Sequence, residues 1–144
     1  MATAGYSGTP LAKKLGIISG SDLALIDEPD GFRPLLDPLP PEVEVQTSLR
    51  AAADVVVMFV TTRVDFEQRI EAAARAIYPN GGLWIAWPKQ TAVKRLKIDT
   101  DITEDVVREV ALPLDLVDNK VCAIDEVWSG LRIVWRREVR GSAG

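Results

Sequence analysis

Two short apolar runs on either side of one amphipathic segment constrain the fold of this chain more than any other feature. The runs are VVVMFV (55–60) and LWIAW (83–87). Both lack the alternation of apolar and polar residues that is typical of a strand with one solvated face. Between them, apolar residues recur at the spacing of one helix face: Phe66, Ile70, Ala73, Ala74 and Ile77. The pattern predicts two parallel, fully buried strands joined by a right-handed crossover helix.

The remaining segments extend this unit in both directions. LALID (23–27) and VEV (43–45) predict two earlier strands, and Thr103 begins a helix that Pro113 ends. The C-terminal stretch predicts an antiparallel hairpin joined around EVWSG. We therefore expect one α/β domain over residues 1–144, Rossmann-like and three-layered, with a mainly parallel sheet and the hairpin at its edge. A short helix is expected over 9–16, and a flexible tail from about 139.

The stretch that follows Pro88 has weak periodicity and many charged residues. Its sequence is KQTAVKRLKIDTDI, and we expect an irregular loop from Lys89 to Ile102. A long irregular loop beside the strand ends would form a mobile cover over a ligand.

Composition excludes several classes of chemistry. The chain has no histidine and one cysteine, Cys122, which rules out an intrachain disulfide, a multi-cysteine zinc site and Ser-His or Cys-His nucleophile pairs. We expect no metal site, because the Asp and Glu spacing resembles no calcium loop. The net charge of −4 argues against a nucleic-acid partner. The apolar runs are too short to span a membrane, and without an apolar leader the expected location is the cytoplasm.

Four blocks of the sequence resemble a family of small actinobacterial proteins that share a domain of unknown function. The blocks are YSGTPLAKKLGI, EPDGF, GGLWIAWPK and VDNKVCAIDEVWSGLRIVWRR. The resemblance covers nearly the whole chain and implies a source and a fold, but no mechanism. The order of elements is also similar to a shortened Rossmann-like methyltransferase, a likeness of fold that does not fix function.

The turn after the first predicted strand, DEPDGF (27–32), is not typical of a cofactor loop. Such loops use several glycines so that backbone N–H groups can approach the ligand. This turn has one glycine, and its three carboxylates would repel a pyrophosphate. No acid that could bind ribose hydroxyls follows Val45. We therefore expect no dinucleotide or S-adenosylmethionine site, no cofactor and no catalytic residue, which favours a protein that is not an enzyme.

Any ligand crevice of such a fold lies beyond the carboxyl ends of the parallel strands. Threonine and lysine side chains there could hold an anion, a tryptophan could offer a flat apolar surface, and the carboxylates favour a ligand amine or hydroxyl. The alternatives are that the threonines cap a helix and that the tryptophan is core. The candidate ligand-binding residues are Asp27, Glu28, Gly31, Thr61, Thr62, Trp87 and Lys89.

Several basic residues and the cysteine have two interpretations each. Lys13 and Lys14 are either solvated at the end of the first helix or contact a phosphate. The cluster of Arg136, Arg137 and Arg140 is either solvated surface or a phosphate or RNA contact. Cys122 lies within KVCAI, which favours an inert core position over a reactive thiol.

Three functions are consistent with these patterns. The first is a non-catalytic binding or regulatory module on a degenerate Rossmann-like scaffold, with a small molecule or a protein as its partner. The alternative is a divergent methyltransferase-like enzyme. The third is an interaction subunit that forms a homo-oligomer through the C-terminal hairpin.

Overall fold

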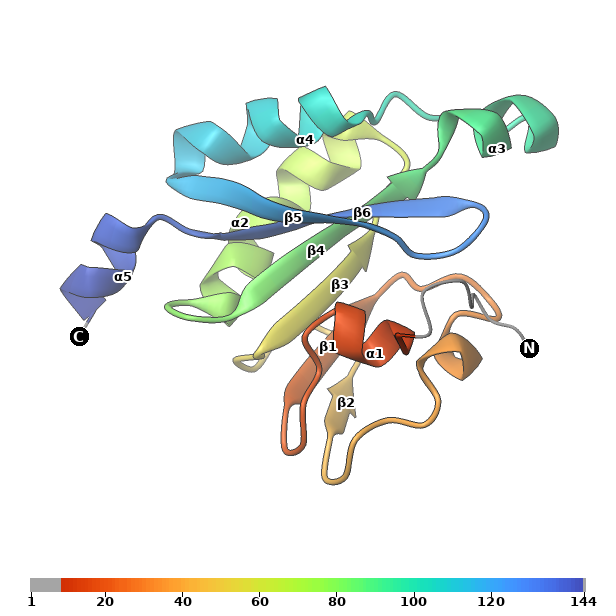
Figure 1. Ribbon diagram of the computed structural model, residues 1–144. Coiled ribbons are helices and arrows are strands. Elements are labelled where there is room, and N and C mark those ends of the chain that lie inside the picture. The colour runs from red at the N-terminus through yellow and green to blue at the C-terminus, as the bar shows by residue number, and fades with distance from the viewer. Residues whose placement is uncertain (1–8, 144) are drawn as a thin grey trace.

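The computed structural model describes residues 9–143, and this part of the chain forms one mixed α/β domain around a six-stranded sheet (Figure 1). The strand order is β2-β1-β3-β4-β6-β5. The strands are β1 (Asp22–Ile26), β2 (Glu44–Gln46), β3 (Val55–Phe59), β4 (Gly82–Pro88), β5 (Leu116–Ala123) and β6 (Trp128–Trp135). The helices are α1 (Leu11–Lys14), α2 (Arg63–Ile77), α3 (Gln90–Leu96), α4 (Glu104–Ala111) and α5 (Arg137–Ala143), with 3-10 helices η2 (Arg33–Leu36) and η3 (Leu112–Leu114).

The sheet is mainly parallel, as the sequence predicts. β1 pairs with β2 and β3, and β3 pairs with β4, all in parallel register. β6 is antiparallel to both β4 and β5. The C-terminal hairpin therefore forms one edge of the sheet, and the predicted Rossmann-like fold class is confirmed.

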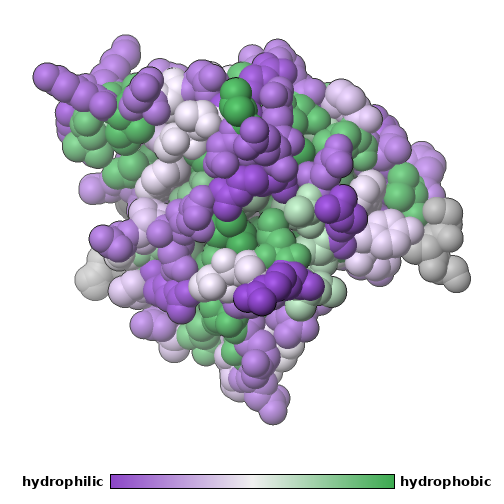
Figure 2. Space-filling model, turned by 180° about the vertical axis from the view of Figure 1, so that it is seen from behind, coloured by the Kyte–Doolittle hydropathy of each residue, from purple (hydrophilic) through white to green (hydrophobic). Residues whose placement is uncertain are grey.

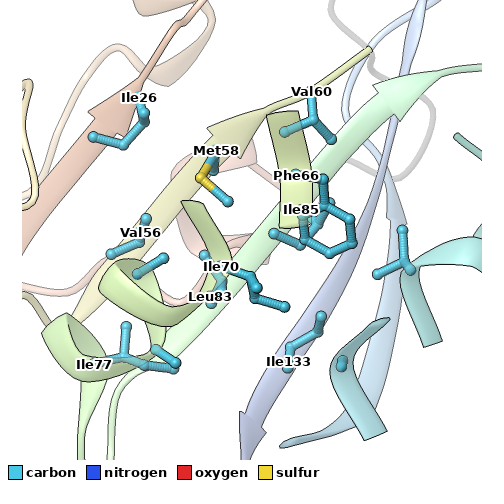
Figure 3. Packing of buried hydrophobic residues seen from close by; sticks show 14 of the residues in the cluster. Ile26, Val56, Met58, Val60, Phe66, Ile70, Ile77, Leu83, Ile85 and Ile133 are labelled. Carbon is cyan, nitrogen blue, oxygen red and sulfur yellow. The ribbon is translucent and has the colours of Figure 1, made fainter. Parts of the chain in front are cut away.

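The larger core lies between the sheet and the helices α2 and α4. The apolar face of α2 packs against inward-facing residues of β3 and β4, where Phe66, Met58 and Ile85 have almost no exposed surface (Figure 3). Thr62 is the N-cap residue of α2, and its hydroxyl accepts a hydrogen bond from the Asp65 N–H at 3.2 Å. Thr103 does the same for the Val106 N–H of α4, so the predicted helix starts are explained by N-caps.

The opposite face of the sheet has much less helical cover. α1 and the 3-10 helix η2 lie there, while α2 and α4 lie on the other face (Figure 1). The buried indole of Trp84 donates to the Leu15 carbonyl at 2.9 Å, which fixes the end of α1 on the centre of the sheet. α1 begins at Leu11, with Pro10 at its N-cap position, and is shorter than the helix expected over 9–16.

The helix side of the molecule is mainly hydrophilic at its surface, with separate apolar patches between the charged groups (Figure 2). No helix within residues 9–143 has both the length and the apolarity needed to cross a bilayer.

The predicted irregular loop from Lys89 to Ile102 is wrong in its first half. Residues Gln90–Leu96 form α3, which Lys97 ends in a left-handed conformation at φ 55°. Only Ala92 of this helix is buried. A helix with one buried residue has no apolar stripe, so its sequence carries no helical periodicity.

The packing of α2 gives a first testable prediction. Ile70→Ala removes a side chain that is 1% exposed from the centre of the core, and we expect the free energy of unfolding to fall by about 2 to 5 kcal/mol. Val64 on the same helix is 62% exposed, so Val64→Ala should change it by less than about 0.5 kcal/mol. Urea unfolding of both variants measures the difference, and equal effects would contradict the described packing.

Candidate functional site

The candidate residues of the predicted crevice lie around the point where the strand order reverses. The chain runs from β1 outward to β2 on one side, and β3 lies on the other side of β1, so the connections diverge between the carboxyl ends of β1 and β3. Asp27 follows β1 with a left-handed φ of 58°, and Gly31 closes the turn at φ 87°. Thr61 and Thr62 follow β3. The structure therefore brings the first turn and the two threonines to neighbouring strand ends.

An ion pair joins the first turn to α2. The Asp27 carboxylate accepts from the Arg69 guanidinium at 2.5 Å, and Asp65 accepts from the same nitrogen at 3.2 Å. Burial of Arg69 alone would lower its pKa, but the hydrogen bond and charge of Asp27 leave that pKa raised. This contact joins the turn after β1 to the helix α2, which follows β3.

The second carboxylate of the turn is also paired. Glu28 accepts two hydrogen bonds from the Arg33 guanidinium, at 2.8 and 3.0 Å. The hydrogen bond from Arg33 to Glu28 raises the pKa of Arg33. Behind the turn, Phe32 is buried and its ring meets Phe59 edge-on at 4.9 Å. A buried aromatic at its end anchors the turn to β3.

The two threonines have different structural roles. Thr62 caps α2 with its hydroxyl. Thr61 uses its backbone carbonyl, which accepts from the Thr100 hydroxyl at 2.7 Å. Asp101 then accepts from the Arg63 N–H at 2.7 Å, so the segment after α3 is tied to the end of β3.

Trp87 and Lys89 lie at the carboxyl end of β4, on the other side of β3 from the first turn. Trp87 is 7% exposed and belongs to the core beneath α2 and α4. Lys89 is half-buried before α3, and its N–H donates to the Val127 carbonyl at 2.7 Å. The positive charge of Lys89 acts to lower the pKa of the Cys122 thiol on β5, against the larger effect of burial. Ligand binding by the seven candidate residues stays a prediction.

The first turn suits some ligands of this fold class better than others. Its carboxylates oppose a dinucleotide, because a pyrophosphate is anionic. An S-adenosyl compound has no phosphate, and its amine and ribose hydroxyls are groups that Asp27 and Glu28 can bind. The turn is less suited to close backbone approach, since Pro29 has no N–H. At the end of β2, the Gln46 amide donates to the Ala51 carbonyl at 3.2 Å, so no carboxylate stands there for the ribose.

A cavity that the sequence did not indicate lies on the sheet face beside α1. It measures about 380 Å³ and is lined by Lys14, Trp84, Lys120, Val121, Cys122 and Ala123. Cys122 is half-buried in this wall, which corrects the predicted core position. Burial raises the pKa of its thiol, opposed by the charges of Lys14 and Lys89. The predicted place of the hairpin at the sheet edge was the available signal, because an edge strand has fewer neighbours to bury its side chains than a central strand.

Within residues 9–143, no three Cys, Asp or Glu side chains are grouped to hold a metal ion.

Comparisons with known proteins show the fold. The sequence matches no protein-family model and no curated protein. The structure is similar to magnesium protoporphyrin IX methyltransferase (ChlM) from Synechocystis PCC 6803 with bound SAH, at TM-score 0.56 and 12% identity over 87% of this chain and 78% of that chain. It is similar to DhpI in complex with SAH, at TM-score 0.60 and 14% identity over 91% and 85%. The N-methyltransferase NodS from Bradyrhizobium japonicum WM9 gives 0.53 and 12% over 83% and 88%.

The threonine pair gives a second prediction. Thr62→Ala removes the hydroxyl that caps α2, and we expect a loss of about 0.5 to 2 kcal/mol in the free energy of unfolding. Thr61→Ala keeps the carbonyl that binds Thr100 and should cost less. Thermal unfolding of the two variants compares them. A larger loss for Thr61→Ala would contradict the assignment of the cap.

Trp87 gives a third prediction. Because Trp87 is buried in the core, Trp87→Ala should lower the free energy of unfolding by about 3 to 5 kcal/mol. Chemical denaturation measures this loss. A variant as stable as the wild type would instead mean that Trp87 does not contribute to the core and acts at the molecular surface.

Proposed function

We propose that the protein is a divergent methyltransferase-like protein that binds a small molecule beyond the carboxyl ends of β1 and β3. The observation that supports this most is the fold, with an antiparallel C-terminal hairpin after the parallel strands. ChlM and DhpI have this fold and were solved with SAH. In such sheets, ligands bind where the strand order reverses, which here is the first turn and Thr61.

Two versions of this function remain, an enzyme and a binding module without catalysis. The comparisons favour the enzyme, because two of the similar structures are methyltransferases by description. The absence of a glycine-rich turn favours the module. We place the enzyme first and assign no catalytic residue and no transfer step to it.

The proposed contacts are those that the sequence indicates, with one change of role. Asp27, Glu28 and Gly31 would meet an amine or hydroxyl of the ligand, and Thr61 and Thr62 would face it from β3. Lys89 would meet an anionic end. Trp87 lies in the core, so its part is to hold β4 in place and not to stack on the ligand.

Ligand binding at Asp27 requires the Arg69 contact to open or to be shared. The Asp27 carboxylate is 64% exposed and that of Asp65 is 42% exposed. An exposed ion pair contributes about 0 to 1 kcal/mol, so a ligand amine can replace Arg69 at small cost. Asp65 then keeps Arg69 neutralised.

Four further predictions come from the sequence. We propose that the chain belongs to the actinobacterial family that its blocks resemble and that it works in the cytoplasm. We also propose that the C-terminal end from about residue 139, which lies in α5, is flexible. A homo-oligomer through the hairpin would use the free edge of β5.

Calorimetric titration with SAH tests the proposed function. A divergent methyltransferase should bind SAH with a Kd in the micromolar range. Asp27→Asn should weaken that binding by about tenfold, the scale of one hydrogen bond to a charged group. Asp30→Asn is the matched control, because Asp30 lies in the same exposed turn and has no described ion pair.

The other outcomes decide between the two versions. If neither SAH nor S-adenosylmethionine binds at millimolar concentration, the enzyme is excluded and the binding module remains. If SAH binds equally to both variants and the wild type, the site lies away from the first turn.

A further inference from the structure

Two cations, Lys120 and Arg132, share one face of the C-terminal half of the sheet. Lys120 of β5 lies directly opposite Arg132 of β6, and Arg132 lies directly opposite Trp84 of β4. Residues opposite each other in antiparallel strands point to the same face, and like charges in such a pair are destabilising. Arg140 of α5 adds a third positive charge, because its proximity lowers the pKa of Arg132 after the larger effect of burial.

The Arg132 side chain lies close against the backbone of β4 at Gly82. A Cβ built on Gly82 would lie 2.5 Å from the Arg132 Nε, so only a glycine allows the guanidinium to lie against this strand. Arg132 is half-buried as a result. A guanidinium placed in a half-buried position beside two other cations carries an electrostatic cost, and no carboxylate of the described residues forms an ion pair that offsets it.

These cations have no carboxylate partner within the described residues. Five other arginines do form ion pairs there: Arg33, Arg63, Arg69, Arg108 and Arg136. The chain as a whole has 21 acidic and 17 basic residues, so acids are not scarce. No ion pair is described for Lys14, Lys120 or Arg132, which leaves this face cationic on an acidic protein.

A cavity of small-molecule size opens on the same face. It is about 380 Å³ in volume, and Lys14 of α1 and Lys120 of β5 approach it from two different elements. Trp84, already tied to Leu15 through its indole N–H, gives it an apolar wall. Sites for small ligands combine such a wall with a few converging polar groups and occupy about 300 to 1,000 Å³.

We propose that this cavity binds the phosphate group of a small organic phosphate, held by Lys14 and Lys120 and neutralising the positive field of Arg132. A phosphate suits the position because several ammonium groups can donate to its oxygens at once. The apolar wall of Trp84 and Val121 would receive the organic part of the ligand. This site is separate from the crevice between β1 and β3, so it does not depend on the proposed function.

The chemistry of the face favours a small molecule over a nucleic acid. Two of the cationic residues, Lys14 and Lys120, line one cavity, whereas a nucleic-acid backbone needs a track of positive charge. The net charge of −4 opposes a long polyanion. A single phosphate needs only the local charge.

Cys122 provides a reporter inside the cavity. It lines the cavity wall, and it is the one cysteine of the chain, so alkylation by neutral iodoacetamide reads this position alone. A bound phosphate would block access and further disfavour the thiolate, which is the form that reacts. Both effects slow the alkylation.

The experiment measures the rate of Cys122 alkylation as inorganic pyrophosphate and adenosine monophosphate are added at constant ionic strength set with sodium chloride. We expect saturable protection by both probes in the wild type. Lys14→Gln and Lys120→Gln should each raise the concentration for half-protection by about tenfold. Lys13→Gln is the matched control, because Lys13 is the exposed neighbour of Lys14 on α1 and the charge change is the same.

Three results would overturn the proposal. The first is no protection by either probe at millimolar concentration. The second is protection that Lys13→Gln weakens as much as Lys14→Gln, which would reflect net charge and not a site. The third is stronger protection by a single-stranded oligonucleotide than by adenosine monophosphate, which would assign the face to nucleic acid. Thermal unfolding of each variant confirms that the fold is retained.

Discussion

Strands β3 and β4 are buried along their whole length on both faces, and this requirement arranges the rest of the chain. On one side, α2 and α4 supply an apolar layer. On the other side, the cover comes from the single turn of α1, from η2 and from the loop around it. The hydrogen bond between Trp84 and Leu15 matters because it holds this thin cover at the centre of the sheet.

Uneven cover produces two different electrostatic environments. At the carboxyl ends of β1 and β3, carboxylates meet arginines and the charges are largely compensated. Over β5 and β6, Lys120 and Arg132 lie opposite each other without a described counter-charge. A sheet that was fully covered on both sides would have had no room for the second environment, because a helix there would bury these cations.

The sequence predicts the parts of the fold that periodicity determines. The α2 face, the strands β3 and β4 and the cap at Thr103 follow from local patterns. α3 does not, because burying only Ala92 leaves no stripe to detect. The contact between Asp27 and Arg69 joins residues 42 positions apart, and no local pattern encodes it. The side of β4 that Trp87 occupies depends on the layers above and below, which only the assembled sheet defines.

The position of β6 has a consequence for how the chain is made. This strand comes last in the sequence but lies between β4 and β5. As the chain leaves the ribosome, β4 keeps a free edge until β6 has emerged, and its apolar residues stay accessible to other nascent chains during that interval. Completion of the sheet is therefore a late and non-local event, which is slow in folding because distant segments must meet. A chain shortened before Trp128 would keep that edge open permanently and should aggregate.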